Sequence, residues 1–229
     1  MAGGPNPSEW SHPDGYYILH TKYYILSVMI SYPLTFIFIG KSGCGKGTQA
    51  TLLTEKIKLA DSREIFRLET GRRFREFVMK DSYSARLARK VNAEGGLQPE
   101  FMAVWLWSSQ MIESMKENQH VIIDGSPRRY HEAGVIDSAL RFYGRKSPIV
   151  VYIHMSDETA RIRMANRKRK DDTDEDINRR LEWFHKDVIP TVEYYRMNPY
   201  YRFVEVDGEF NFPEIHKSIL QKLHDIFLE

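Results

Sequence analysis

The chain has 229 residues, with 33 Lys and Arg against 31 Asp and Glu, which gives a formal net charge of +2. Hydrophobic residues make up 42% and charged residues 28%, proportions that are ordinary for a soluble globular protein. The near-neutral charge argues against a generic nucleic-acid-binding protein, and 14 Gly and 10 Pro exclude collagen-like and low-complexity classes. The single cysteine, Cys44, excludes an intramolecular disulfide and a cysteine-based zinc site, so we expect a cytoplasmic protein without zinc.

Residues 1–33 are interpreted as an N-terminal extension of unknown role. A polar leader rich in Pro and Gly is followed by the apolar, tyrosine-rich stretch Tyr16–Ile30. That stretch is shorter than the ~20 apolar residues that cross a bilayer and is interrupted by His20 and Lys22, so a membrane role is disfavoured. A secretory signal is also disfavoured, because a basic start and a small-residue cleavage site are missing. Two interpretations remain: a segment packed on the domain, or a protein that begins at Met29.

From residue 34 onward, apolar runs alternate with segments of helical pattern. A continuous apolar run such as Leu34–Ile39, closed by glycine, is typical of a buried parallel strand. Helices of about ten or more residues between such strands predict a parallel sheet covered on both faces. We predict five strands, at 34–39, 65–68, 120–124, 148–154 and 201–206. The helices are predicted at 46–59, 71–80, 82–94, 99–118, 129–143, 156–167, 174–197 and 212–227.

The first predicted strand runs into a glycine-rich loop, Gly40–Gln49. Its order of strand, glycine-rich turn, lysine, hydroxyl residue and helix is typical of a Walker-type loop, whose backbone N–H groups wrap a phosphate. Lys46 can reach the β- and γ-phosphates, and Thr48 can hold Mg²⁺. The strict pattern has Ser or Thr directly after Lys, whereas here Gly47 intervenes. A glycine-rich turn without a ligand is the alternative interpretation.

The Gly-Lys-Gly-Thr-Gln segment at 45–49 resembles the loop of adenylate kinases and related nucleoside monophosphate kinases, and the resemblance extends over 34–227. It implies an α/β P-loop kinase fold in a domain at 34–229, with a helical monophosphate-binding region near 69–98 and a short lid near 167–175. It implies an enzyme that reversibly transfers a phosphoryl group from Mg²⁺-bound ATP to a nucleoside monophosphate, with AMP favoured. The ATP contacts implied are Gly43, Cys44, Gly45, Lys46, Gly47, Thr48, Arg163, Arg167 and Gly208.

The resemblance also implies a monophosphate site after the second and third predicted strands. Residues 70–75 match the family's Thr-Gly-x-x-x-Arg segment, and 95–99 match a loop that passes over the base. Residues 124–128 resemble the family's Asp-Gly-Phe-Pro-Arg motif, with Ser126 in place of the aromatic residue. The monophosphate contacts implied are Thr70, Gly71, Arg75, Gln98, Gly125, Arg128 and Glu132. The magnesium contacts implied are Thr48 and, through water, Asp124.

Glu132 lies four residues after Arg128, where adenylate kinases usually carry a glutamine that reads adenine. An ionised carboxylate only accepts hydrogen bonds, so it suits the adenine amino group but not the neighbouring ring nitrogen. Guanine, with two adjacent donors on that edge, fits a carboxylate better. A kinase for GMP, CMP or UMP is therefore an alternative. A P-loop kinase for another metabolite and a non-catalytic nucleotide-binding module have less support.

Arg163 and Arg167 lie four residues apart on one predicted helical face and match the family's arginines for the base and phosphates of ATP. The charged run 167–175 resembles the family's lid in its short form, in which we expect Asp171 and Asp172 to pair with arginines. The catalytic residues implied are Lys46, Arg128, Arg163, Arg169 and Arg180. The partners implied are ATP and a nucleoside monophosphate, and we expect a monomer that binds no nucleic acid.

Overall fold

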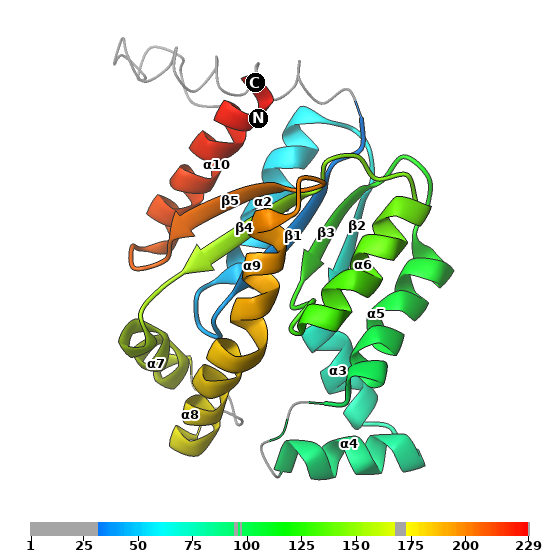
Figure 1. The fold of residues 1–229 in the computed structure, drawn as a ribbon, viewed down its shortest axis with the longest axis vertical. Coiled ribbons are helices and arrows are strands. Elements are labelled where there is room, and N and C mark those ends of the chain that lie inside the picture. The colour runs from blue at the N-terminus through cyan, green and yellow to red at the C-terminus, as the bar shows by residue number, and fades with distance from the viewer. Residues whose placement is uncertain (1–31, 94–95, 97, 168–172, 229) are drawn as a thin grey trace, which may run out of the picture.

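The computed structural model describes residues 32–93, 96, 98–167 and 173–228 of the chain. Its centre is a sheet of five parallel strands in the order β2-β3-β1-β4-β5 (Figure 1). This confirms the predicted α/β fold, and every strand boundary lies within one residue of its predicted place. The strands are β1 (Thr35–Gly40), β2 (Ile65–Glu69), β3 (His120–Asp124), β4 (Ile149–His154) and β5 (Arg202–Asp207).

Helices cover both faces of this sheet (Figure 1). Within the ranges that the structure describes, no helix is long and apolar enough to cross a membrane. The helices are α2 (Lys46–Ala60), α3 (Thr70–Val78), α4 (Tyr83–Ala93), α5 (Glu100–Ser114), α6 (Tyr130–Phe142), α7 (Asp157–Asn166), α8 (Asp174–Trp183), the π-helical turn η2 (Phe184–Val188), α9 (Ile189–Met197) and α10 (Phe212–Leu228). The extension predicted at 1–33 lies almost entirely outside the described residues.

Alternating side chains of β1 divide the core into two layers. Phe36 and Phe38 are buried with residues of α2, α7, α8 and α10, whereas Ile37 and Ile39 are buried with residues of α5, α6 and α9. The alternation follows from the pleat of a strand covered on both faces, and it explains why the apolar run is continuous. Burial of β1 at the centre of the sheet fixes the point where the strand ends, at Gly40, and hence the loop that follows.

A third and smaller hydrophobic cluster joins α3, α4 and α5. The Phe77 ring meets the Trp105 ring edge-on, with 5.4 Å between the ring centroids. Small residues of α4 let the helices approach closely. The helices over 70–93 are therefore held mainly by a cluster of their own. Its buried residues are Phe77, Ala85, Ala88, Met102 and Leu106.

The prediction of one continuous helix over 174–197 is wrong, because η2 separates α8 from α9. Pro190 lies in the first turn of α9. Proline has no N–H to donate, and its ring clashes with the carbonyl group four residues earlier, here that of Lys186. Regular α-helical pairing therefore cannot pass through this turn, and the chain widens into a π-turn instead.

The helix predicted at 99–118 is also too long, because α5 ends at Ser114. Asn118 has a φ of 61°, and the backbone N–H of Lys116 donates to Gln119 Oε1 at 2.8 Å. These local interactions turn the chain into β3 before the helical pattern of the sequence has ended. The other predicted helix boundaries differ from the structure by one or two residues, which is within the usual fraying of helix ends.

Candidate functional site

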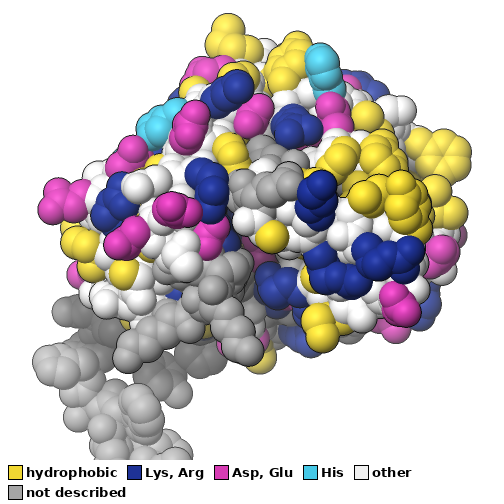
Figure 2. Space-filling model, turned by 90° about the horizontal axis from the view of Figure 1, so that it is seen from below, with side chains coloured by type: hydrophobic (Ala, Val, Ile, Leu, Met, Phe, Trp, Pro, Cys, Tyr) yellow, Lys and Arg dark blue, Asp and Glu magenta, His cyan; other side chains and the backbone are white. Residues whose placement is uncertain are grey.

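A cavity of about 1250 Å³ opens at the carboxyl ends of the strands. The last residues of β1, β2 and β3 line it, and β1 is the point where the strand order reverses, the usual place for a ligand in an open α/β sheet. Seen from this end, Lys and Arg side chains gather along the rim of a hollow (Figure 2). The predicted site residues that line the cavity are Gly43, Gly45, Lys46, Gly47, Thr48, Thr70, Gly71, Arg75, Gln98, Asp124, Gly125, Arg128, Glu132, Arg163, Arg167 and Arg180.

The loop between β1 and α2 forms one wall of the cavity. Gly43 and Gly45 have φ angles of +87° and +91°, a left-handed conformation that residues with side chains rarely adopt. Helix α2 begins at Lys46, so the positive end of its dipole lies at the cavity. The Lys46 ammonium donates to the carbonyl oxygens of Gly40 at 2.7 Å and Lys41 at 2.8 Å. This wall therefore combines backbone N–H groups, a helix dipole and a cation, as a polyphosphate requires.

Two predicted ATP contacts lie away from the cavity lining. The Cys44 thiol is buried in the core, 3.7 Å from Lys46 Nζ. A β-carbon on Gly208 would lie 2.6 Å from the carbonyl oxygen of His154, and the Gly208 N–H donates to that oxygen at 2.7 Å. Gly208 thus allows close contact between the segments after β4 and β5. Outside the described residues lie Arg169, Asp171 and Asp172.

Asp124 is the last residue of β3 and lies beside the start of α2. A β-carbon on Gly47 would lie 3.1 Å from Asp124 Oδ2, so the glycine that departs from the strict Walker pattern leaves room for this carboxylate. Burial raises the pKa of Asp124, and the nearby Lys46 and Arg67 oppose that shift. Thr48 is exposed on the same wall. A carboxylate and a hydroxyl are oxygen ligands of the kind that Mg²⁺ prefers, so these residues fit the ion.

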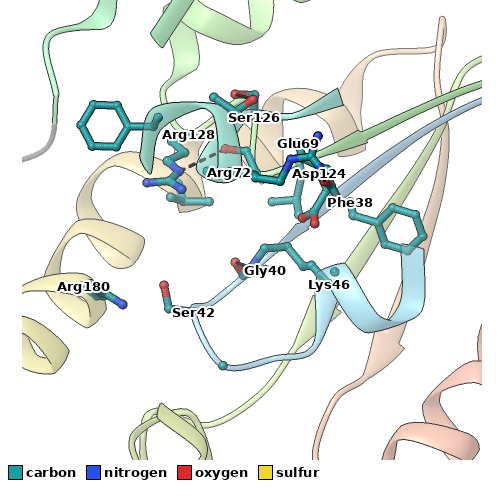
Figure 3. A pocket seen from close by; sticks show the side chains of 18 of the residues that line it. Phe38, Gly40, Ser42, Lys46, Glu69, Arg72, Asp124, Ser126, Arg128 and Arg180 are labelled. Carbon is teal, nitrogen blue, oxygen red and sulfur yellow. Dashed lines mark hydrogen bonds and ion pairs between the residues drawn. The ribbon is translucent and has the colours of Figure 1, made fainter. Parts of the chain in front are cut away.

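Two guanidinium groups converge on the opposite wall. A β-carbon on Gly71 would lie 3.5 Å from Arg75 Nη1 and 4.0 Å from Arg128 Nη2. The Ser126 hydroxyl donates to the Thr70 hydroxyl at 2.9 Å, which ties the end of β3 to the start of α3. Figure 3 shows Arg128 on this side and Lys46 on the other. Two planar cations at one spot can bind a phosphate by paired hydrogen bonds.

Glu132 is buried, and both of its carboxylate oxygens accept hydrogen bonds from the protein. Oε1 accepts from the Trp107 indole N–H at 3.1 Å, and Oε2 accepts from the backbone N–H of Arg128 at 2.7 Å. In contrast, Gln98 Oε1 is buried and accepts no hydrogen bond from the described residues. Glu132 therefore supports the position of Arg128, whereas Gln98 lines the cavity and has a buried acceptor oxygen.

Arginines from the two helices after β4 line the remaining side. Arg163 Nη2 donates to the carbonyl oxygen of Phe210 at 2.7 Å, and the Arg163 guanidinium lies over the Phe212 ring, 5.6 Å from its centroid. Arg167 lines the cavity near the end of α7. Arg180 points from α8 toward the glycine-rich loop between β1 and α2 (Figure 3). Cations therefore surround the space in front of that loop.

Among the cavity residues that sequence reasoning missed, Phe212 and Arg67 contact the loop and the start of α2. Phe212 packs on the loop, because a β-carbon on Gly45 would lie 2.6 Å from its Cε1. Arg67 of β2 donates to the Thr51 hydroxyl at 2.8 Å and to the Gly47 carbonyl oxygen at 3.2 Å, which braces the start of α2. A charged residue inside a short buried strand was the available signal for Arg67, since an unpaired charge there is costly. Nothing local pointed to Phe212.

Comparisons with known proteins show similarity over most of the chain. A model of the adenylate kinase family matches residues 38–199. The adenylate kinase of Oenococcus oeni is 30% identical over 186 residues, which cover 80% of this chain and 96% of that protein. The adenylate kinase of Prochlorococcus marinus (strain MIT 9515) is 28% identical over 187 residues, covering 82% of this chain and 97% of that protein. That of Encephalitozoon cuniculi is 28% identical over 189 residues, covering 80% and 96%.

Proposed function

The chain belongs to the adenylate kinase family, and we propose that it reversibly transfers the γ-phosphoryl group of Mg²⁺-bound ATP to AMP, giving two ADP. One observation carries the proposal. A single cavity has the phosphate-binding loop with Lys46 on one wall and the converging Arg75 and Arg128 on the other. Two separate anion-binding walls facing one space suit a reaction between two phosphate esters.

On the donor side, the loop N–H groups and Lys46 would bind the β- and γ-phosphates of ATP. Arg163, fixed by its hydrogen bond to Phe210 and placed over Phe212, would support the base or the phosphates. Thr48, with Asp124 through water, would hold Mg²⁺, which when bound supplies neutralisation of the phosphate charge. Arg180, and Arg169 by the resemblance, would lie against the moving phosphoryl group.

On the acceptor side, Arg75 and Arg128 would grip the monophosphate so that its oxygen faces the γ-phosphoryl group. The acceptor is already an anionic phosphate oxygen, so no side chain needs to act as a base. Catalysis would then come from alignment and charge neutralisation, together with exclusion of water. We propose that the region near 69–98 and the short lid near 167–175 close over the substrates, and that the catalytic domain spans 34–229.

AMP is the acceptor that we propose, and Glu132 is the reason to test others. Direct pairing of its carboxylate with guanine would require oxygens that already accept hydrogen bonds from Trp107 and Arg128. Gln98 Oε1, which accepts none from the described residues, suits the amino group of adenine. We propose further that the enzyme is cytoplasmic, as the lone cysteine suggests, and that it is a monomer.

The test is to supply ATP and Mg²⁺ with AMP, GMP, CMP or UMP in turn and to follow ADP formation. We expect turnover that is selective for AMP. Turnover selective for GMP or a pyrimidine monophosphate would support the second candidate. No turnover with any of the four acceptors would indicate a P-loop kinase for another metabolite or a non-catalytic nucleotide-binding module.

A Glu132→Gln variant separates a structural role from base recognition. The glutamine would turn an NH₂ group toward a donor N–H, and one lost buried hydrogen bond should cost about 1–3 kcal/mol of stability. We expect the order of preference among the four monophosphates to stay the same, measured in the same assay alongside denaturant unfolding. Glu113→Gln, at an exposed position of α5, is the control. A changed order would mean that Glu132 contacts the base.

A further inference from the structure

Lys41 belongs to the phosphate-binding loop, but its side chain does not line the cavity. The side chain is 9% exposed, and its ammonium donates to the carbonyl oxygen of Met155 at 2.6 Å. The same ammonium lies 2.5 Å from Asp157 Oδ1 and 5.3 Å from the centroid of the Phe184 ring. A buried ammonium is costly unless it is paired, and here one carboxylate and one carbonyl group hold it in a single place.

The backbone of the same residue holds the reactive side of the loop. The Lys41 carbonyl oxygen accepts from Lys46 Nζ at 2.8 Å and from the backbone N–H of Cys44 at 3.3 Å. The Lys41 side chain therefore contacts Met155 and Asp157, away from the cavity, while its backbone carbonyl group contacts Lys46 and Cys44 of the loop. A shift of the side-chain anchor would move the carbonyl group that orients the Lys46 ammonium.

Asp157 connects this anchor to the helices that carry the arginines. It is the first residue of α7, which also carries Arg163, and its carboxylate lies 2.9 Å from His185 Nε2. His185 belongs to η2, which directly follows α8 with Arg180. Although burial opposes the shift, the hydrogen bonds from Lys41 and His185 hold the pKa of Asp157 below its ordinary value. One carboxylate thus joins the loop to α7 and to the π-turn.

We propose that Lys41 is a positioning residue for phosphoryl transfer, whose ion pair with Asp157 holds the phosphate-binding loop in register with the helices that carry Arg163 and Arg180. The proposal rests on the proposed function, because it assigns Lys41 an effect on that reaction. The reacting groups come from three segments that are far apart in sequence, and transfer requires them to be aligned at once. A displacement of about 1 Å in such an arrangement can cost about 100-fold in rate.

The ion pair between Lys41 and Asp157, here called the tether, is tested by the variants Lys41→Met and Asp157→Asn and by the double variant. Lys58→Met, which replaces an exposed lysine on α2, is the control. We expect Lys41→Met to lower kcat about 10- to 100-fold, with the KM for AMP changed by less than about twofold. The double variant should lose no more than the worse single variant, since both remove the same ion pair. Lys41→Arg, which keeps the charge, should retain more activity than Lys41→Met.

Amide hydrogen exchange of residues 41–48, measured without substrates, provides a readout that does not depend on turnover. We expect faster exchange there in Lys41→Met than in the wild type or Lys58→Met, at equal melting temperature or after correction for any difference. A wild-type kcat in Lys41→Met, or additive losses in the double variant, would overturn the positioning role. Absence of transfer by the wild type would instead refute the proposed function, and the exchange data would still test the tether.

Discussion

The two sides of the cavity are built on different supports. The donor side, with Lys46 and Asp124, follows β1 and β3, whose residues are buried in large hydrophobic clusters on both faces of the sheet. On the acceptor side, Arg75 projects from α3, which packs with α4 and α5 through a smaller cluster of its own. Arg128 lies between the two, because it follows β3 but converges with Arg75.

This difference in packing suggests that the two sides of the cavity differ in mobility during the reaction. A strand buried on both faces opens only when the whole domain unfolds, whereas a few helices held by a small cluster can open at lower free energy. We therefore expect the donor side to stay fixed and the region over 70–93 to move. Phosphoryl transfer needs both behaviours, because the phosphates must be aligned and water must be excluded by closure.

The largest expected effect is the loss of Lys46, the cation of the fixed side. Lys46→Met should lower the transfer rate by about 1,000-fold or more, because it removes a positive charge from the transferring phosphoryl group. The melting temperature should change little, since the hydrogen bonds that the ammonium makes within the described residues go to its own loop, to the carbonyl groups of Gly40 and Lys41 and to the Cys44 thiol. Steady-state kinetics and thermal unfolding check both points, with Lys58→Met as the control. Retention of more than a few per cent of activity would contradict the donor-side assignment.

A smaller effect is expected on the acceptor side. Arg75→Met should lower kcat/KM for AMP about 10- to 100-fold, the value of a charged hydrogen bond or two, and leave the KM for ATP unchanged. Arg73→Met is the matched control, because Arg73 lies on the same helix and does not line the cavity. Equal losses for AMP and ATP would mean that the two sides do not bind separate substrates.

Truncations of buried side chains test the two hydrophobic clusters directly, the large one on the sheet and the smaller one that joins α3, α4 and α5. Leu140→Ala, in the cluster that α5, α6 and α9 form with one face of the sheet, should lower the free energy of unfolding of the whole domain by about 2–5 kcal/mol. Phe77→Ala, in the smaller cluster, should instead speed amide exchange over 70–93 more than in β1 or β3. Exchange that rises equally in both regions of the Phe77 variant would remove the proposed difference in mobility.

The smallest effect concerns the buried carboxylate of the donor side. Burial raises the pKa of Asp124 in the folded state above its ordinary value of 3.8. The protonated carboxyl group therefore favours the folded state, and this contribution to the free energy of unfolding is complete below pH 3.8. It is lost as pH rises through the folded-state pKa, where the buried group must ionise. Asp124→Asn should therefore melt higher than the wild type at pH 7 without nucleotide, and this advantage should vanish in acid. Melting curves across pH check this, and a lower melting temperature of the variant at pH 7 would contradict it.

The strands and the phosphate-binding loop were predictable because their signals are local. A continuous apolar run such as that of β1 requires burial on both faces, and the glycines at 43 and 45 are required by their backbone angles. The interruption at η2 was less visible, since a proline near the middle of a long helical pattern allows either a kink or a widened turn.

The roles of Glu132 and Lys41 depend on contacts that local patterns do not carry. Glu132 accepts from Trp107, which lies on another helix, and the ammonium of Lys41 bonds to the carbonyl group of Met155, more than a hundred positions along the chain. The spacing after Arg128 placed Glu132 at a base-reading position, but only the fold brings the donors that occupy its oxygens. Side chains whose partners come from distant segments were the part of the site that sequence reasoning could not define.

The most direct test of the central claim follows the transferred atom. ATP labelled with ³²P in its γ-phosphate is supplied with Mg²⁺ and unlabelled AMP, and the products are separated, with Lys46→Met as the inactive control. If two nucleotides react across one cavity, the label appears in the β-phosphate of ADP at the rate of AMP consumption, with little free phosphate. Label released as inorganic phosphate while AMP remains unchanged would contradict the claim, because it would mean that water is the acceptor.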